Sequence, residues 1–126
     1  MAWVGCEKSQ EQIVASRPVK EVKQLEGALV ALKNHLGEPN YSRANDPAIS
    51  AAQQAITEYL PMFINEASMD ESVKEEVLAK LEEIDKVFTD RVLGPVDGKP
   101  QDLAKGAEGV DECLPLVVEL KSLLGG

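Results

Sequence analysis

The sequence predicts an all-α protein, an antiparallel up-down-up-down four-helix bundle that follows a flexible N-terminal segment. Three observations predict this fold. Apolar residues recur at alternating spacings of three and four, which places them on one face of a helix. Glycine and proline fall between these periodic stretches, and no alternating run of β-branched residues marks a strand. We therefore expect a tether over 1–15 and a bundle over 16–126, with helices near 16–36, 46–67, 69–93 and 100–124.

The first helix is expected to begin near Ser16, because serine is a favourable N-cap and Pro18 is tolerated in a first turn. Its apolar face comprises Val22, Leu25, Leu29, Leu32 and Leu36. Gly37 follows this face and is typical of a left-handed C-cap. The polar residues 7–12 show no helical periodicity, so we expect a tether or loop there.

The second helix is expected to begin at Asp46-Pro47, with aspartate as N-cap and proline in the first helical position. Its predicted apolar face comprises Ile49, Ala52, Ile56, Tyr59 and Phe63. Pro61 lies inside this helix, where it removes one backbone hydrogen bond. We expect a kink at that point.

The third helix has a capping-box pattern at its start, with Ser68 as N-cap and Glu71 three residues later. Its predicted apolar face comprises Val73, Val77, Leu81, Ile84, Phe88 and Val92. Gly94-Pro95 is expected to end it.

The fourth helix is expected to start near Pro100 or Gln101 and to contain Pro115. Its predicted face comprises Leu103, Val110, Leu114, Val117 and Leu124, with Ala107, Cys113 and Leu120 beside it. Four helices of about 20 residues, each about 30 Å long, are joined by short loops, so neighbouring helices are antiparallel.

The composition excludes several classes of function. The chain has 22 acidic residues and 13 lysines and arginines, which gives a net charge of −9. A nucleic-acid binder needs the opposite, a surplus of positively charged side chains. No apolar run approaches the ~18 residues of a transmembrane helix. One histidine and two cysteines cannot supply a usual zinc site, a haem-attachment motif or the paired Glu-x-x-His motifs of di-iron bundles. We therefore expect no metal and no cofactor.

His35 is placed in the last turn of the first helix, where a cationic ring suits the helix dipole, and we interpret it as structural. The acidic clusters around Glu75, Glu82 and Asp111 are interpreted as solvated helix faces. We expect no catalytic residues, because an enzyme would need a polar pocket that converges on His35.

Cys6 has three interpretations. Trp3-Val4-Gly5-Cys6 resembles the end of a bacterial lipobox, in which the cysteine is lipidated and becomes the mature N-terminus. Cys6 could instead form a disulfide with Cys113 in an oxidising compartment, or be incidental. Cys113 lies beside the predicted apolar face and is otherwise expected to be a small core residue.

Pro61 and Pro115 predict either a shared widening of the bundle or two kinks absorbed by packing. In the first case a pocket would lie near them, lined by Tyr59, Met62 and Phe63. Cys113, two residues before Pro115, is expected to belong to the same pocket or kink region.

Two stretches carry a family resemblance: Leu78–Val87, which contains Ile84-Asp85, and the leucine-rich end Leu116–Gly125. They are similar to the third and fourth helices of the extrinsic Q subunit of photosystem II, a four-helix bundle after a flexible N-terminal segment. Cyanobacterial members are lumenal lipoproteins with an N-terminal cysteine. The family's tryptophan near the start of the second helix has no counterpart, and Tyr41 is the nearest aromatic residue. The resemblance implies a photosynthetic subunit in the thylakoid lumen and assigns no functional residues.

Two functions follow as hypotheses. The first is a non-catalytic extrinsic subunit, outside the cytoplasm in the thylakoid lumen or periplasm, that docks on and stabilises a membrane-associated assembly through protein–protein contacts. Its acidic helix faces and its N-terminus would make those contacts. The second is a soluble or lipid-anchored periplasmic bundle that binds a small apolar ligand between kinked helices.

Overall fold

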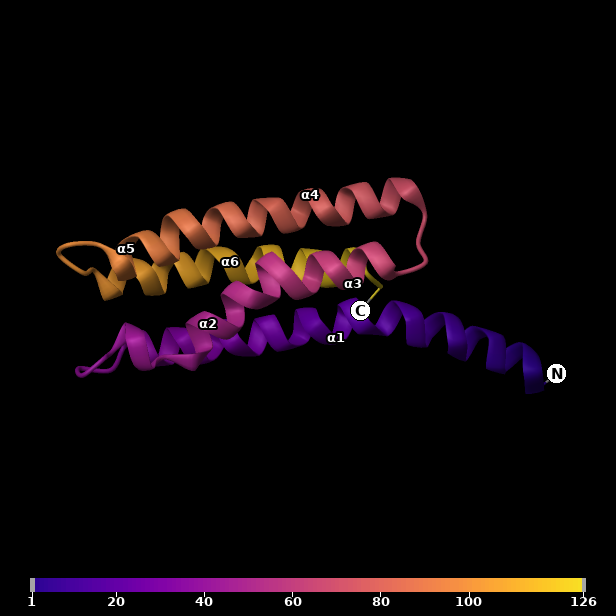
Figure 1. Ribbon diagram of the computed structural model, residues 1–126, viewed down its shortest axis with the longest axis horizontal. Coiled ribbons are helices and arrows are strands. Elements are labelled where there is room, and N and C mark those ends of the chain that lie inside the picture. Colours follow the sequence, from indigo (N-terminus) through magenta and orange to yellow (C-terminus); the bar gives the residue numbers. More distant parts are fainter. Residues whose placement is uncertain (1, 126) are drawn as a thin grey trace.

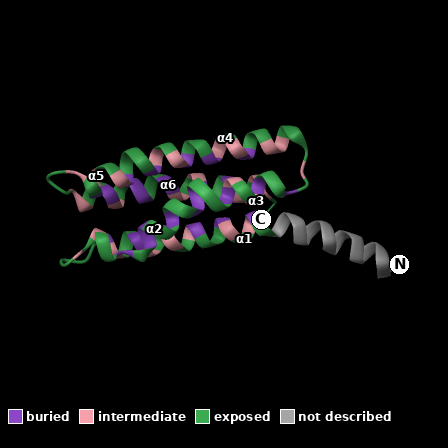
Figure 2. Ribbon diagram, viewed as in Figure 1, coloured by how far each residue is buried: buried purple, intermediate pink, exposed green. Residues whose placement is uncertain are grey.

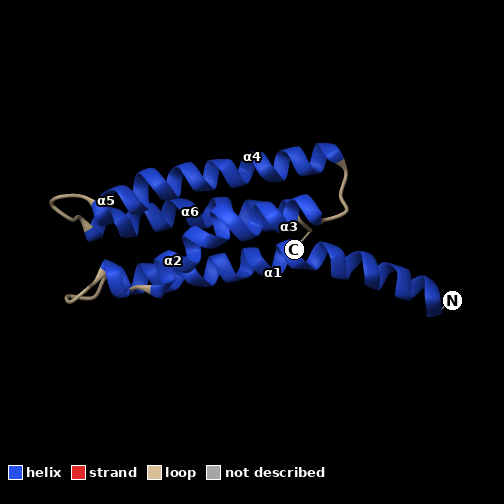
Figure 3. Ribbon diagram, in the orientation of Figure 1, coloured by secondary structure: helices blue, strands red, loops and turns tan. Residues whose placement is uncertain are grey.

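The computed structural model describes the backbone of residues 2–125 and the side chains of residues 17–125. These residues form four helical rods joined by loops, and the described part of the chain contains no strand (Figures 1 and 3). The first rod is α1 (Ala2–Leu36), and the second combines α2 (Pro47–Gln54), η2 (Ala55–Tyr59) and α3 (Leu60–Glu66). The third combines α4 (Glu71–Val87), η3 (Phe88–Leu93) and α5 (Gly94–Asp97), and the fourth is α6 (Leu103–Leu123). A short 3₁₀ turn, η1 (Arg43–Asn45), lies in the loop between the first two rods.

The rods pack as an antiparallel up-down-up-down bundle, which confirms the predicted fold class. α6 packs against α1 and α4, whereas α2 packs against α1, and α3 packs against both α1 and α4. The second rod therefore lies diagonally across the bundle from α6. No helix in the described residues is both long enough and apolar enough to pass through a bilayer.

The core lies between the rods, where Figure 2 shows the buried residues in purple. All five apolar residues predicted for the first helix are buried there, between 0% and 5% exposed. In proteins, most of the stability of an amphipathic helix comes from packing of such a stripe rather than from helix propensity.

Several predicted helix ends are wrong. α1 begins at Ala2 rather than near Ser16, so Pro18 lies inside the helix and not in its first turn. α4 begins after Asp70 rather than Ser68, so the predicted capping box does not form. α6 begins at Leu103, because Asp102 serves as N-cap and accepts a hydrogen bond from the Lys105 N–H at 3.1 Å.

Pro61 is accommodated by a π-helical turn directly before it. In this turn, η2, the Leu60 N–H donates to the carbonyl of Ala55, five residues back. Proline has no N–H, and in an α-helix its ring would clash with the carbonyl four residues back, which here belongs to Thr57. The wider π turn contains Thr57 and relieves both problems, as π-bulges do elsewhere in helices.

The π turn changes which residues face the core. The sequence predicts an apolar face that continues through Tyr59 and Phe63, on the assumption of 3.6 residues per turn. The structure instead buries Leu60 and Ile64 completely, and Tyr59 is 39% exposed. The prediction was wrong by one residue, because a π turn holds more residues per turn than an α-helix and rotates the following segment.

The third rod repeats this arrangement at Pro95. η3 precedes this proline, and the Gly94 N–H donates to the carbonyl of Thr89, again five residues back. Gly94-Pro95 therefore does not end the helix as predicted, and helical structure continues to Asp97. By contrast, α6 remains α-helical through Pro115.

Two glycines allow α6 to approach the third rod closely. A Cβ atom added to Gly109 would overlap the backbone carbonyl of Arg91, the residue four before Pro95. A Cβ added to Gly106 would lie 2.7 Å from a methyl carbon of Val96. Glycine is therefore needed at position 109 because a Cβ atom would collide with the backbone of the third rod, and not because the position has an unusual φ angle.

We expect Gly109→Ala to lower the free energy of unfolding by about 2–3 kcal/mol, because backbone atoms must move to admit the methyl group. Gly27→Ala is the matched control, since Gly27 is an exposed helical position with open space around its Cα. The control is expected to gain about 0.5–1 kcal/mol. Urea unfolding measures both values, and equal effects would contradict the close approach of α6 to η3.

The register after the π turn gives a second prediction. We expect Leu60→Ala to cost about 2–5 kcal/mol, because it leaves a cavity in the core. Tyr59→Ala, at a position 39% exposed, is expected to cost less than half as much. A larger loss for Tyr59→Ala than for Leu60→Ala in chemical denaturation would contradict the register shift and would indicate an uninterrupted α-helix.

Candidate functional site

The most connected polar cluster in the described residues lies at the end of the bundle where α1 meets α2. Its centre is Asp46, whose side chain is only 2% exposed. Asp46 is the N-cap of α2 and accepts a hydrogen bond from the Ala48 N–H at 3.0 Å. The predicted Asp46-Pro47 helix start is therefore confirmed.

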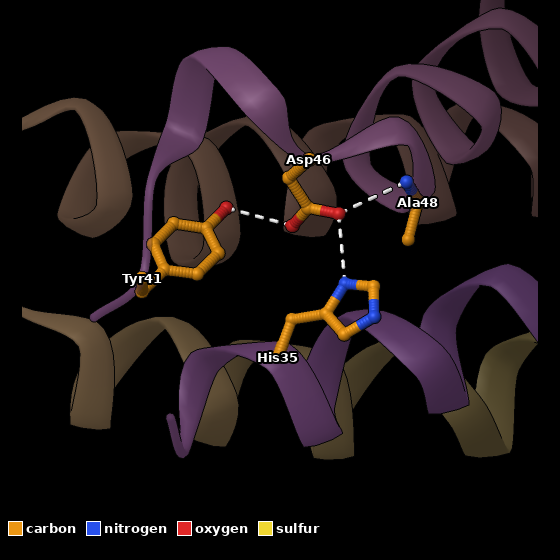
Figure 4. Close-up of polar contacts among 4 residues, drawn as sticks. All are labelled: His35, Tyr41, Asp46 and Ala48. Atoms are coloured by element: carbon orange, nitrogen blue, oxygen red, sulfur yellow. Dashed lines mark hydrogen bonds and ion pairs between the residues drawn. The ribbon is translucent and has the colours of Figure 1, made fainter. Parts of the chain in front are cut away.

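Two further side chains donate to the same carboxylate (Figure 4). Nδ1 of His35, at the end of α1, lies 2.9 Å from Oδ1 of Asp46. The hydroxyl of Tyr41, in the loop, donates to Oδ2 at 2.8 Å. Both carboxylate oxygens are thus satisfied, and the network fastens the loop to both helices.

Burial and hydrogen bonding act in opposite directions on Asp46. Burial alone would raise the pKa of its carboxyl group, but the bonds from His35, Tyr41 and Ala48 outweigh it and hold this pKa below its usual value. The pKa of Tyr41 is raised, first by burial and then by its hydrogen bond to the Asp46 carboxylate. The folded protein therefore favours an ionised Asp46 beside a neutral Tyr41.

A surface cavity of about 470 Å³ lies beside this network. Its lining is mostly polar and consists of His35, Glu38, Asn40, Tyr41, Ser42, Asn45, Asp46 and Pro47. A ring that donates from Nδ1 to Asp46 leaves Nε2 outside the network, as in a base oriented by a carboxylate. Ser42 supplies a hydroxyl, but no hydrogen bond joins it to His35 among the described contacts.

A second concavity, the Pro61 groove, lies between the second rod and α4 and has a volume of about 280 Å³. It is lined by Ile56, Thr57, Pro61, Leu78, Leu81, Glu82 and Asp85. The π turn positions the first three of these residues, and two consecutive turns of α4 supply the rest.

The residues predicted to line a shared pocket are not brought together. Of them, Pro61 lines the groove, whereas Tyr59 and Met62 point outward, 39% and 45% exposed. Phe63 is half-buried, and Pro115 is exposed on the diagonally opposite α6. Pro61 lines this groove and Pro115 does not, so the groove is not the predicted shared pocket.

Cys113 is a free thiol that is fully buried in the core. Burial, with a smaller contribution from the charge of Glu112, raises its pKa to about 12. This matches the expected small core residue. The side chain of Cys6 lies outside the described residues, and so does its predicted lipidation.

Sequence reasoning assigned His35 a structural role but missed its partner. The signal was available, because Asp46 is a predicted N-cap with potential donors five and eleven residues before it. No set of three or more His, Cys, Asp and Glu side chains within residues 17–125 is arranged to hold a metal ion. Scans against protein-family models, curated proteins and solved structures gave no match for this chain.

We expect Asp46→Asn to lower the free energy of unfolding at neutral pH by about 1–3 kcal/mol, because three donors lose a charged acceptor. The pKa of Asp46 is lower in the folded state than its unfolded value of about 3.9. The folded state therefore binds fewer protons, and this contribution disappears as the pH falls below about 4. The difference between wild type and variant should shrink over that range.

Asp102→Asn provides the matched control for this prediction. Asp102 is also an N-cap, but its side chain accepts one backbone hydrogen bond, from Lys105. We expect a smaller loss than for Asp46→Asn in urea unfolding at neutral pH. Equal losses, or a difference that persists unchanged at acid pH, would contradict a central role for the Asp46 network.

Proposed function

We propose that this protein is a non-catalytic helical-bundle subunit that docks on a larger, membrane-associated assembly and stabilises it. The observation that carries the proposal is the exposure of Tyr59 and Met62 on the second rod. They are three residues apart, so they lie on adjacent turns of the same side of the rod. Large aromatic and methionine side chains on a surface are typical of protein interfaces.

The polar cluster supports a structural rather than a chemical role for the only histidine. Both oxygens of Asp46 are occupied, and the network joins the end of α1, the loop and the start of α2. This arrangement stiffens one end of the bundle. A stiff scaffold binds with a smaller loss of conformational entropy than a mobile one.

The location of the assembly rests on the sequence. The lipobox-like Trp3–Cys6 stretch and the resemblance to the photosystem II Q subunit support an extracytoplasmic place, in the thylakoid lumen or periplasm. In this proposal Cys6 carries a lipid anchor and the bundle contacts lumenal or periplasmic protein surfaces.

The alternative of an apolar ligand held between the kinked helices has less support. Pro61 and Pro115 lie on diagonally opposite rods, and Pro115 does not line the Pro61 groove. Beside Pro61, the side chains of Ile56, Leu60 and Ile64 fill the interior and are at most 2% exposed.

The docking proposal is tested by placing a photoreactive phenylalanine analogue at Met62 and, separately, at Val118. Val118 is a matched control, because it is 44% exposed but lies on α6, away from the second rod. In the native host we expect the Met62 probe to cross-link to one defined protein and the Val118 probe to give little product. Equal products from both positions, or none from Met62, would contradict the proposal.

A further inference from the structure

We propose that the Pro61 groove is the docking site for a basic amphipathic helix of a partner protein. The inference rests on the proposed function, because it names the partner chemistry of the docking subunit. The apolar face of the partner helix enters the groove, and its lysine or arginine side chains pair with Glu82 and Asp85.

The groove has the shape and lining for apolar side chains. Pro61 and Leu78, both partly exposed, form its apolar surface, and the buried side chains of Ile56 and Leu81 lie beneath them. Its volume of about 280 Å³ lies just below the range of about 300–1,000 Å³ that is usual for small-molecule pockets. One or two aliphatic side chains from successive turns of a helix suit this volume, as in other helix-in-groove interfaces.

The acidic residues of the groove differ from Asp111 and Glu119 on α6, which form ion pairs. On α6, Asp111 and Glu119 pair with Lys33 and Lys80, each at 2.7 Å. Within residues 17–125, no such cation lies within ion-pair distance of Glu82 or Asp85. Asp85 accepts only a long hydrogen bond, 3.5 Å, from the Thr89 hydroxyl.

The unpaired carboxylates of Glu82 and Asp85 favour a partner that carries positive charge. They lie three residues apart on α4, one turn of the helix, so they present two negative charges along one edge of the groove. A second copy of this chain carries a net charge of −9 and would be repelled. A helix with cations beside its apolar face complements both the lining and the edge.

Met62 is a second exposed apolar residue near the groove, although it is not part of the groove lining. It follows Pro61 directly and is 45% exposed. Methionine side chains are flexible and polarisable, and they adapt to varied partner surfaces.

The test uses the purified full-length protein and two synthetic helical peptides with the same leucine face. One peptide carries lysine on its polar face, and the other carries glutamate. We expect the lysine peptide to bind, with an affinity that falls as salt is added, and the glutamate peptide to bind at least about tenfold more weakly. Equal binding of the two peptides would overturn the proposal.

Two pairs of variants locate the binding. Thr57→Trp fills the groove from an exposed position, and Ser50→Trp is its control on the exposed side of α2. Glu82→Lys reverses a charge at the groove, and Glu108→Lys makes the same change on α6. We expect Thr57→Trp and Glu82→Lys each to lower the affinity for the lysine peptide about tenfold. The two control variants are expected to change this affinity by less than about twofold.

Circular dichroism melting verifies that each variant remains folded. Unchanged affinity in folded Thr57→Trp, or concentration-dependent dimerisation that Thr57→Trp abolishes, would overturn the inference. Failure of the lysine peptide while the Met62 probe still captures its protein would refute the basic-helix partner and leave the docking function standing. Loss of capture as well would refute both.

Discussion

The missing backbone N–H of proline is the constraint on which the shape of two of the four rods depends. At Pro61 and Pro95 the helix continues through a widened preceding turn, with hydrogen bonds from Leu60 and Gly94 to carbonyls five residues back. At Pro61 this change buries Leu60, exposes Tyr59 and shapes the groove against α4. At Pro95 it places the Arg91 carbonyl against Gly109 and determines how α6 packs.

The cavity at Asp46 and the Pro61 groove have different physical characters. At the end of the bundle, a buried carboxylate collects donors from α1, the loop and α2, so its charge is satisfied within the chain. On the side of the second rod, an apolar groove is bordered by carboxylates with no cation from residues 17–125. The first arrangement stabilises the fold, whereas the second leaves charge and apolar surface available to a partner.

The sequence was sufficient for the fold class, the four rods and the start of α2, because these depend on spacing and on a strong N-cap. It was insufficient beyond Pro61, because periodicity analysis assumes a constant 3.6 residues per turn and cannot see a π turn. Gly94-Pro95 was misread as a helix end, because the rule that glycine and proline stop a helix does not allow for a widened turn before the proline. The polar cluster was missed because Asp46 was considered only as the N-cap of α2, although His35 and Tyr41 lie within eleven residues before it.

The most direct test of this account is the through-hydrogen-bond scalar coupling of the Leu60 amide, measured by NMR on the isotope-labelled protein. A coupling between the Leu60 nitrogen and the carbonyl carbon of Ala55 is predicted, because the bond spans five residues. A coupling to the carbonyl carbon of Ile56 instead would mean an ordinary α-helical turn. The register shift, the exposure of Tyr59 and the argument for the groove would then fail together.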